Sequence, residues 1–264
     1  MRFWDGYKGS SFVELLATEH PHLKPDVGRW IAGDRDLPAT AHGTTVLGLR
    51  WADGVLVAGD RLATMGHQVA SREIEKVYAT DAYSLMAIAG AAGPAIEMAR
   101  LLGVQFEHHE KIEGEALELE GKANTLSQLI RQNLPAAMQG MVVVPIFAGF
   151  DRRRRLGRVW RYEVTGGRFE ERDFDSVGSG SIFARESLKK SYQGGADRND
   201  ALRMALEALT DAADEDRGTG GVDELRGIYP RVKLCTSAGV EDVSDDEVAQ
   251  VYRNLLESRR RRVG

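Results

Sequence analysis

The sequence of 264 residues contains a single cysteine, Cys235. One cysteine excludes an internal disulfide and is typical of proteins that remain in a reducing compartment. Because Cys235 lies in the largely apolar run "VKLC", we expect a buried, unreactive thiol rather than a nucleophile.

Long hydrophobic runs and an excess of positive charge are absent as well. No stretch approaches the roughly 18 consecutive apolar residues that a membrane-spanning helix needs. The first twenty residues carry Asp5, Lys8 and Glu14, so they do not resemble a secretory signal. The formal net charge is −5, which argues against a general nucleic-acid binder. We therefore expect a cytoplasmic protein that acts on neither membranes nor nucleic acid.

The chain changes character after residue 43. Residues 1–43 hold three of the seven prolines and no sustained strand pattern, which indicates a leader. Four short apolar runs follow, "TTVLGLRW", "VLVAGD", "EIEKVYAT" and "YSLMAIAG". The pair Asp53-Gly54 between the first two is a strong hairpin signal. These runs predict an antiparallel sheet that is buried on at least one face.

The remaining pattern alternates pairs of helices with further strands. Apolar residues at Ala95, Met98, Ala99 and Leu102 have helical spacing, and a second such stripe begins at Leu119. Strands return at "MVVVPIFAGF", "GRVWRYEV" and a run near Phe174 to Val177, followed by two helices, a strand pair and a final helix. This order predicts an α+β fold, a four-layer α-β-β-α sandwich of two antiparallel sheets.

The step Gly43-Thr44 is the first candidate for chemistry. A threonine hydroxyl is a poor nucleophile at neutral pH and needs a base nearby. The threonine's own α-amine, with an ordinary pKa of about 7.7–8.0, could serve as that base. Such an amine exists only when the bond before Thr44 is broken, and glycine tolerates the backbone strain of a cleavage site.

Three polar features could support an amine base. Asp60 ends the second run, Lys76 lies within the third, and "SVGSGS" places Ser179 between glycines before a helix. A charged lysine near the amine and the hydroxyl would lower their pKa values. Taken singly, such residues are more often a strand-end turn aspartate, an exposed strand lysine and a serine in a loop before a helix.

Six motifs, taken together, favour the functional interpretation of these residues. They are "HGTTVLGL", "GVLVAGDRLAT", "REIEKVYATD", "MAIAGAAGPAIEMAR", "SVGSGSIFA" and "DRGTGGVDELRGIYP", in this order. The combination closely resembles the β subunits of the 20S proteasome, of the type found in actinobacteria. The resemblance covers nearly all of residues 42–256.

The resemblance implies a threonine peptidase of the N-terminal nucleophile class, made as a precursor. Gly43-Thr44 matches the processing bond that such a chain cuts itself. Residues 1–43 would then be a propeptide, and residues 44–264 the β-type peptidase domain. Thr44 would become the N-terminal nucleophile, with its freed amine moving the proton.

The resemblance also implies supporting roles. Asp60 and Lys76 match the charged pair beside the nucleophile. Gly90 matches the glycine whose backbone N–H stabilises the oxyanion. The residues that hold the threonine amine in the family correspond to Ser179, Asp216 and Thr219.

Substrate-binding positions carry over in the same way. Thr64 and Ala92 match residues that pair with the substrate backbone as an added strand. The lining of the main specificity pocket corresponds to Ala63, Ile74, Ile88, Ala92 and Ile96. Because these side chains are small or aliphatic and none is charged, we expect a preference for apolar residues before the cut.

Two positions depart from the family pattern. Leu62 stands where a second arginine often follows "GDR", and Arg217-Gly218 stands where serine-alanine is common. Neither difference removes a residue matched to a catalytic role.

The resemblance further implies assembly. The chain would form homo-heptameric β rings between rings of α subunits, in a 28-subunit α7β7β7α7 particle. A ring ATPase would unfold and deliver protein substrates. No cofactor or metal is implied, and the six histidines show no convincing ligand spacing.

Two other hypotheses belong to different classes. The chain could be a non-catalytic, structural ring subunit in which Gly43-Thr44 is never cut, although the joint presence of Thr44, Asp60 and Lys76 argues against it. It could also bind nucleic acid through the arginine runs at 152–155 and 259–262. The acidic balance of the chain argues against that hypothesis.

Overall fold

The computed structural model describes residues 43–65 and 68–263. The strands of the first sheet lie in the order β10-β1-β2-β11-β12, and those of the second in the order β5-β6-β7-β8-β9. The first sheet contains β1 (Thr45–Trp51), β2 (Gly54–Gly59), β10 (Phe174–Gly178), β11 (Arg231–Thr236) and β12 (Gly239–Asp242). The second contains β5 (Val77–Asp81), β6 (Ser84–Gly90), β7 (Val143–Asp151), β8 (Leu156–Tyr162) and β9 (Arg168–Glu171). All the strand pairs in both sheets are antiparallel.

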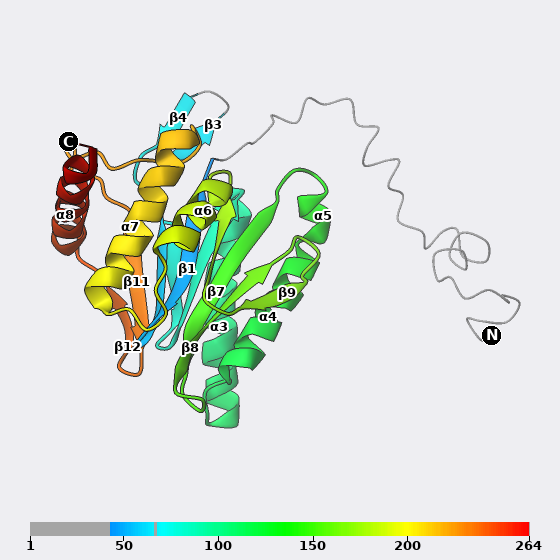
Figure 1. Ribbon diagram of the computed structural model, residues 1–264. Helices are drawn as coiled ribbons and strands as arrows, with labels where there is room; N and C mark the ends of the chain where they lie inside the picture. The colour runs from blue at the N-terminus through cyan, green and yellow to red at the C-terminus, as the bar shows by residue number, and fades with distance from the viewer. Residues whose placement is uncertain (1–42, 66–67, 264) are drawn as a thin grey trace, which may run out of the picture. The chain divides into compact units, whose positions relative to one another are not determined.

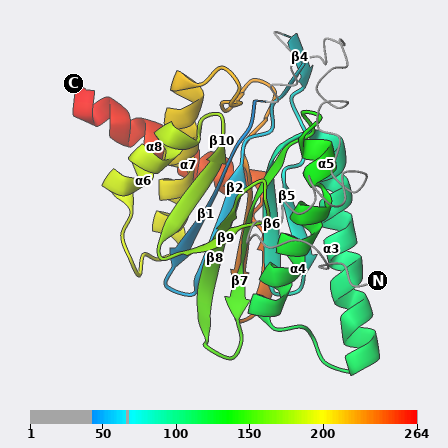
Figure 2. The same ribbon diagram turned by 90° about the vertical axis from the view of Figure 1, so that its right-hand side faces the viewer.

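A short hairpin and the helices complete the described residues. The hairpin consists of β3 (Ala63–Met65) and β4 (Gln68–Ser71). The helices are α3 (Ala92–Glu113), α4 (Leu119–Gln132), α5 (Leu134–Ala137), α6 (Ser181–Ser191), α7 (Arg198–Glu215) and α8 (Asp245–Val263). Figures 1 and 2 show α6, α7 and α8 on the side of the first sheet, and α3, α4 and α5 on the side of the second.

Three hydrophobic clusters fill the spaces between the layers. One joins the first sheet to α6, α7 and α8, and a second joins the second sheet to α3 and α4. The third lies between the two sheets. Three interlayer cores define four layers, so the predicted α-β-β-α sandwich is confirmed.

Strand β2 shows why the sequence folds in this way. Val55 and Val57 point into the core between the sheets, whereas Leu56 and Ala58 point to the core under the helices. All four side chains are fully buried. A strand with both faces covered reads as a continuous apolar run rather than an alternating one.

The predicted hairpin between the first two strands is confirmed. Trp51 pairs with Gly54, which leaves Ala52 and Asp53 as the two-residue loop. The prediction that the first four runs form one sheet is wrong. β1 and β2 lie in the first sheet and β5 and β6 in the second, because the free edge of β2 pairs with β11.

The third predicted strand also begins later than expected. We placed Lys76 inside it, but β5 begins at Val77. The Glu75 carboxylate accepts a hydrogen bond from the Val77 backbone N–H at 3.2 Å and so ends the irregular segment before the strand. The hairpin β3-β4, strand β9 and helix α5 were not predicted.

None of the helices within residues 43–65 and 68–263 is long and apolar enough to cross a membrane. Of the predicted propeptide, only Gly43 lies among the described residues.

Candidate active site

Thr44 lies directly before β1, at the end of the strand where the chain arrives from the leader. Its side chain is almost fully buried. The Thr44 carbonyl accepts a hydrogen bond from the Ser179 backbone N–H at 2.8 Å, which fixes this end of β1 against the end of β10. The chain is continuous through Gly43-Thr44, so the nitrogen of Thr44 belongs to an amide.

The Thr44 hydroxyl lies against the peptide bond that precedes it. Oγ1 donates a hydrogen bond to the carbonyl oxygen of Gly43 at 2.6 Å. On the other side, the backbone N–H of Thr44 donates to Ser179 Oγ at 3.3 Å. The Thr44 hydroxyl, the Gly43 carbonyl and the backbone nitrogen of Thr44 therefore lie within one small hydrogen-bonded network.

Lys76 and Asp60 form a buried ion pair beside this network. The Lys76 ammonium lies 2.7 Å from Asp60 Oδ1 and donates a second hydrogen bond to the Leu62 carbonyl at 2.6 Å. Burial lowers the pKa of Lys76, and the carboxylate of Asp60 partly opposes that shift. Leu62, one of the two departures from the family pattern, takes part through its backbone alone.

Backbone donors complete the surroundings of Asp60. Its Oδ1 accepts from the Thr45 N–H at 2.8 Å. Its Oδ2 accepts from the N–H groups of Leu62 and Gly220, each at 2.9 Å. A carboxylate with this many donors is held in one orientation, and Asp60 in turn fixes the ammonium of Lys76.

A second carboxylate lies at the other side of Thr44. Asp216 Oδ2 accepts hydrogen bonds from the hydroxyls of Ser179, at 2.5 Å, and Thr219, at 2.6 Å. Burial raises the pKa of Asp216, but these two hydrogen bonds, the backbone N–H of Gly218 and the charge of Lys76 together leave the pKa below its ordinary value. Ser179 thus connects an ionised carboxylate to the nitrogen of Thr44.

A small cavity of about 30 Å³ contains both Thr44 and Lys76 in its wall. Five residues predicted to line the specificity pocket do line it: Ala63, Ile74, Ile88, Ala92 and Ile96. Thr64 is not part of the lining, but its hydroxyl accepts a hydrogen bond from the Gly43 N–H at 3.2 Å.

Glu75 and Tyr78 also line this cavity and were not predicted. The carboxylate of Glu75 is partly neutralised, since Oε2 lies 3.3 Å from Nε of Arg231. The Tyr78 hydroxyl donates to the Glu75 carbonyl at 2.6 Å. Our expectation of an uncharged lining was therefore incomplete. The run "REIEKVY" predicts a strand that contains Lys76, but no pattern in it predicts that Glu75 lines the cavity.

Gly90 lies at the same cavity, where β6 ends and the chain turns toward α3. Its φ of +117° is rarely adopted by other residues. A Cβ atom here would lie 2.1 Å from the carbonyl oxygen of Val142. The structure therefore requires glycine at the position matched to the oxyanion donor.

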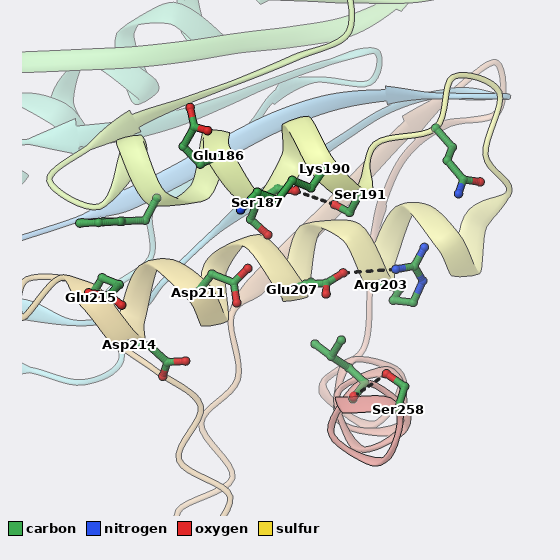
Figure 3. A pocket seen from close by; sticks show the side chains of 13 residues that line it. Glu186, Ser187, Lys190, Ser191, Arg203, Glu207, Asp211, Asp214, Glu215 and Ser258 are labelled. Atoms are coloured by element: carbon green, nitrogen blue, oxygen red, sulfur yellow. Dashed lines mark hydrogen bonds and ion pairs between the residues drawn. The ribbon is translucent and has the colours of Figure 1, made fainter. Parts of the chain in front are cut away.

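A larger cavity of about 680 Å³ lies elsewhere, among α6, α7 and α8. In Figure 3, Ser187 comes from α6, Glu207 and Asp211 from α7, and Ser258 from α8. Arg203 and Arg259 pair with these carboxylates. None of the predicted site residues lines this cavity, so the candidate site remains the small cavity at Thr44.

Within the described part of the chain, no group of three or more histidine, cysteine, aspartate or glutamate side chains could hold a metal ion. The acidic groups at Thr44 are instead satisfied by an ammonium, hydroxyls and backbone N–H groups.

The chain is also similar in sequence to known proteins. Residues 40–226 match the family described as "Proteasome subunit". The chain is 49% identical over 260 residues to "Proteasome subunit beta" of Rhodococcus erythropolis, covering 95% of this chain and 88% of that one. It is 48% identical over 260 residues to "Proteasome subunit beta" of Stackebrandtia nassauensis, covering 95% and 91%. A third relative, "Proteasome subunit beta" of Acidothermus cellulolyticus, is 48% identical over 254 residues, covering 95% and 87%.

Proposed function

The chain belongs to the proteasome subunit family and is a β subunit of the actinobacterial type, and we propose that it is a catalytic one. It would be a threonine endopeptidase that hydrolyses peptide bonds of unfolded proteins. The observation that carries this proposal is the position of Thr44, which shares one cavity with Lys76 and lies beside a glycine carbonyl. A structural ring subunit would have no need for a buried lysine at that place.

In the proposed mechanism, the Thr44 hydroxyl attacks the carbonyl carbon of the substrate and passes its proton to the free Thr44 amine. The C–N bond of the substrate breaks, and the leaving amine takes that proton. Water then hydrolyses the resulting ester, which releases the acid product and restores the hydroxyl. Ser179 and Asp216 would orient the amine, and Lys76 would lower the pKa of the attacking hydroxyl.

Stabilisation of the developing oxyanion is assigned to the backbone N–H of Gly90. One such donor contributes typically about 3–4 kcal/mol in the transition state. The strained backbone and lack of side-chain space at Gly90 support a role in which its backbone faces the substrate.

The same hydroxyl is proposed to activate the chain. Attack on the Gly43 carbonyl carbon moves the acyl group from the nitrogen to the oxygen of Thr44. That shift breaks the C–N bond and frees the amine, and hydrolysis of the resulting ester then releases residues 1–43 and restores the hydroxyl. The 2.6 Å contact between the hydroxyl and the Gly43 carbonyl oxygen supports this step. Residues 1–43 would then be a propeptide that masks the nucleophile.

Substrates would bind along the segment around Thr64 and Ala92 as an added strand. Apolar walls at Ala63, Ile74 and Ile96 support a preference for apolar residues before the cut.

As a proteasome subunit, the chain assembles with other subunits into the proteasome particle. The further details are proposals that rest on family membership: seven-membered β rings between α rings, a ring ATPase that unfolds substrates, and a cytoplasmic location. Enclosure in such a particle would keep an unspecific peptidase away from folded proteins.

Substitution of Thr44 tests the proposal. Thr44→Ala should assemble with α subunits but show no hydrolysis of apolar fluorogenic peptides. Thr44→Ser keeps a hydroxyl and should retain measurable hydrolysis. Equal activity of the wild type and Thr44→Ala would remove Thr44 from the mechanism, and an inactive wild-type particle would favour the structural-subunit hypothesis.

A further inference from the structure

Thr45, the residue after the proposed nucleophile, has no part in the mechanism above. Its side chain is completely buried. The Thr45 hydroxyl lies 2.6 Å from Thr219 Oγ1 and 3.0 Å from the backbone nitrogen of Gly180. Buried hydroxyls need partners, and both partners of this one belong to segments that build the site.

The directions of these hydrogen bonds follow from what each group can donate. The Gly180 N–H can only donate, and an ionised Asp216 can only accept. Thr219 has one hydroxyl proton, which it gives to Asp216. Thr219 must therefore accept from Thr45, and Thr45 accepts from Gly180. The donors therefore follow one another from Gly180 to Thr45, from Thr45 to Thr219 and from Thr219 to Asp216, and each of these protons is in a hydrogen bond.

The backbone of Thr45 connects to the opposite side of the site. Its N–H donates to Asp60 Oδ1 at 2.8 Å, the same oxygen that accepts from Lys76. Thr45 therefore contacts the Asp60-Lys76 pair directly through its backbone, and it is linked indirectly to Asp216 through the hydroxyl of Thr219.

The space around the hydroxyl is closed. A Cβ atom at Gly180 would lie 2.5 Å from Thr45 Oγ1 and 2.6 Å from Thr219 Oγ1. No larger residue fits at that position without displacing the two hydroxyls. Close packing restricts the rotamers of Thr45 and Thr219. Residues that support a catalytic site need such restricted side chains.

We propose that Thr45 is a positioning residue of the peptidase site, whose hydroxyl fixes Thr219 and Asp216 relative to Thr44. The inference rests on the proposed function and adds a residue to it. Thr45 does not line the substrate cavity, so it acts on the orientation of the nucleophile and its amine rather than on substrate binding.

Replacement of Thr45 by valine removes the hydroxyl and keeps the shape. In assembled particles, kcat per processed chain, as counted by intact mass, should fall roughly tenfold or more, with KM changed little. Thr45→Ser keeps the hydroxyl and should restore most of the rate. If Thr45→Val does not assemble, Thr45→Ala removes the same hydroxyl without adding bulk.

Thr80 offers a matched control. Its hydroxyl pairs with that of Ser84 at 2.7 Å, and both residues are buried. Thr80→Val therefore removes a similar buried hydroxyl pair outside the site, and its kcat should match that of the wild type. A kcat of Thr45→Val within twofold of the wild type, or an equal loss in Thr80→Val, would overturn the proposal.

A double-mutant cycle tests whether Thr45 acts through Thr219. Thr219→Val should lower kcat on its own, and the addition of Thr45→Val should then cause little further loss. Independent, multiplying losses would contradict the proposal. If the wild-type particle itself hydrolyses no peptide, the proposed function fails; if the wild type is active and Thr45→Val is unaffected, only this inference fails.

Discussion

Lys76 and Asp60 are both removed from water, and each depends on the other. Their side chains are 6% and 0% exposed. Pairing and backbone donors offset the cost of burying the two charges, but loss of either partner leaves the other uncompensated. Such buried charge pairs are common at functional sites, and here the pair makes the stability of the fold depend on both partners.

Replacement of Lys76 by methionine exposes that dependence. Because Asp60 would lose its buried partner, Lys76→Met should lower the unfolding free energy of the β subunit by about 3–5 kcal/mol, as measured by urea denaturation. Hydrolysis should also disappear. Lys111→Met is the matched control, since Lys111 pairs with Glu107 on the surface, and it should leave the urea midpoint almost unchanged. Equal midpoints for both variants would contradict the account.

The carboxylate of Asp216 contributes to the stability of the folded chain in a way that depends on pH. Burial alone would raise its pKa, but the hydrogen bonds from Ser179, Thr219 and the Gly218 N–H, together with the charge of Lys76, lower the pKa in the folded chain. A carboxyl group with a lowered pKa stabilises the folded chain fully at pH values above its ordinary pKa of about 3.9. This stabilisation is lost as the pH falls through the pKa of the folded state.

The stability difference between the wild type and Asp216→Asn should therefore be larger at pH 7 than at pH 3. Urea denaturation of both proteins at the two pH values measures it. If the difference in unfolding free energy is the same at both pH values, the hydroxyls of Ser179 and Thr219 do not stabilise the charged form of Asp216.

At the scale of the elements, the junctions of strands and helices place the site. Thr44 lies before β1, Asp60 after β2, Gly90 at the end of β6 and Ser179 after β10. Strand ends are where a side chain or a backbone group can face a cavity while the strand itself stays in the core. The junction at Gly90 is the most constrained, because both its φ and its surroundings exclude a side chain.

Gly90→Ala should therefore destabilise the chain by about 2 kcal/mol or more, through a strained φ and contact with Val142. It should also lower kcat. Gly93→Ala, at the second residue of α3, is the control, since a Cβ there meets open space and alanine favours a helix. Thermal melting of both variants distinguishes them; equal melting temperatures would argue against a special backbone at Gly90.

Most elements could be predicted from periodicity, and the failures have local causes. Strands such as β2 and helices such as α3 bury long apolar faces, which leave a clear pattern. The start of β5 could not be predicted from periodicity. The Glu75 side chain accepts the hydrogen bond of the Val77 N–H, and Lys76 is buried in an ion pair with Asp60, which follows β2. The strands of the hairpin β3-β4 are only three and four residues long, and every residue of β4 is exposed, so they leave no clear pattern.

At the scale of the whole molecule, the site is assembled from distant parts of the chain. Thr44 meets Ser179 across 135 positions, and Asp60 meets Gly220 across 160. No local pattern predicts such contacts, so the resemblance to a family supplied the predicted set. The geometry then brought Thr44, Ser179 and Asp216 into one hydrogen-bonded network. Thr45 was missed although it stands beside Thr44, because the second threonine reads simply as a strand residue.

The most direct test of the account is the intact mass of the β chain in particles assembled with α subunits. The account predicts that the wild-type chain loses residues 1–43 and begins with a free amine at Thr44, while Thr44→Ala keeps its full mass and is inactive. A wild-type chain that hydrolyses peptides at full length, or a Thr44→Ala chain that is cut at the same bond, would contradict it.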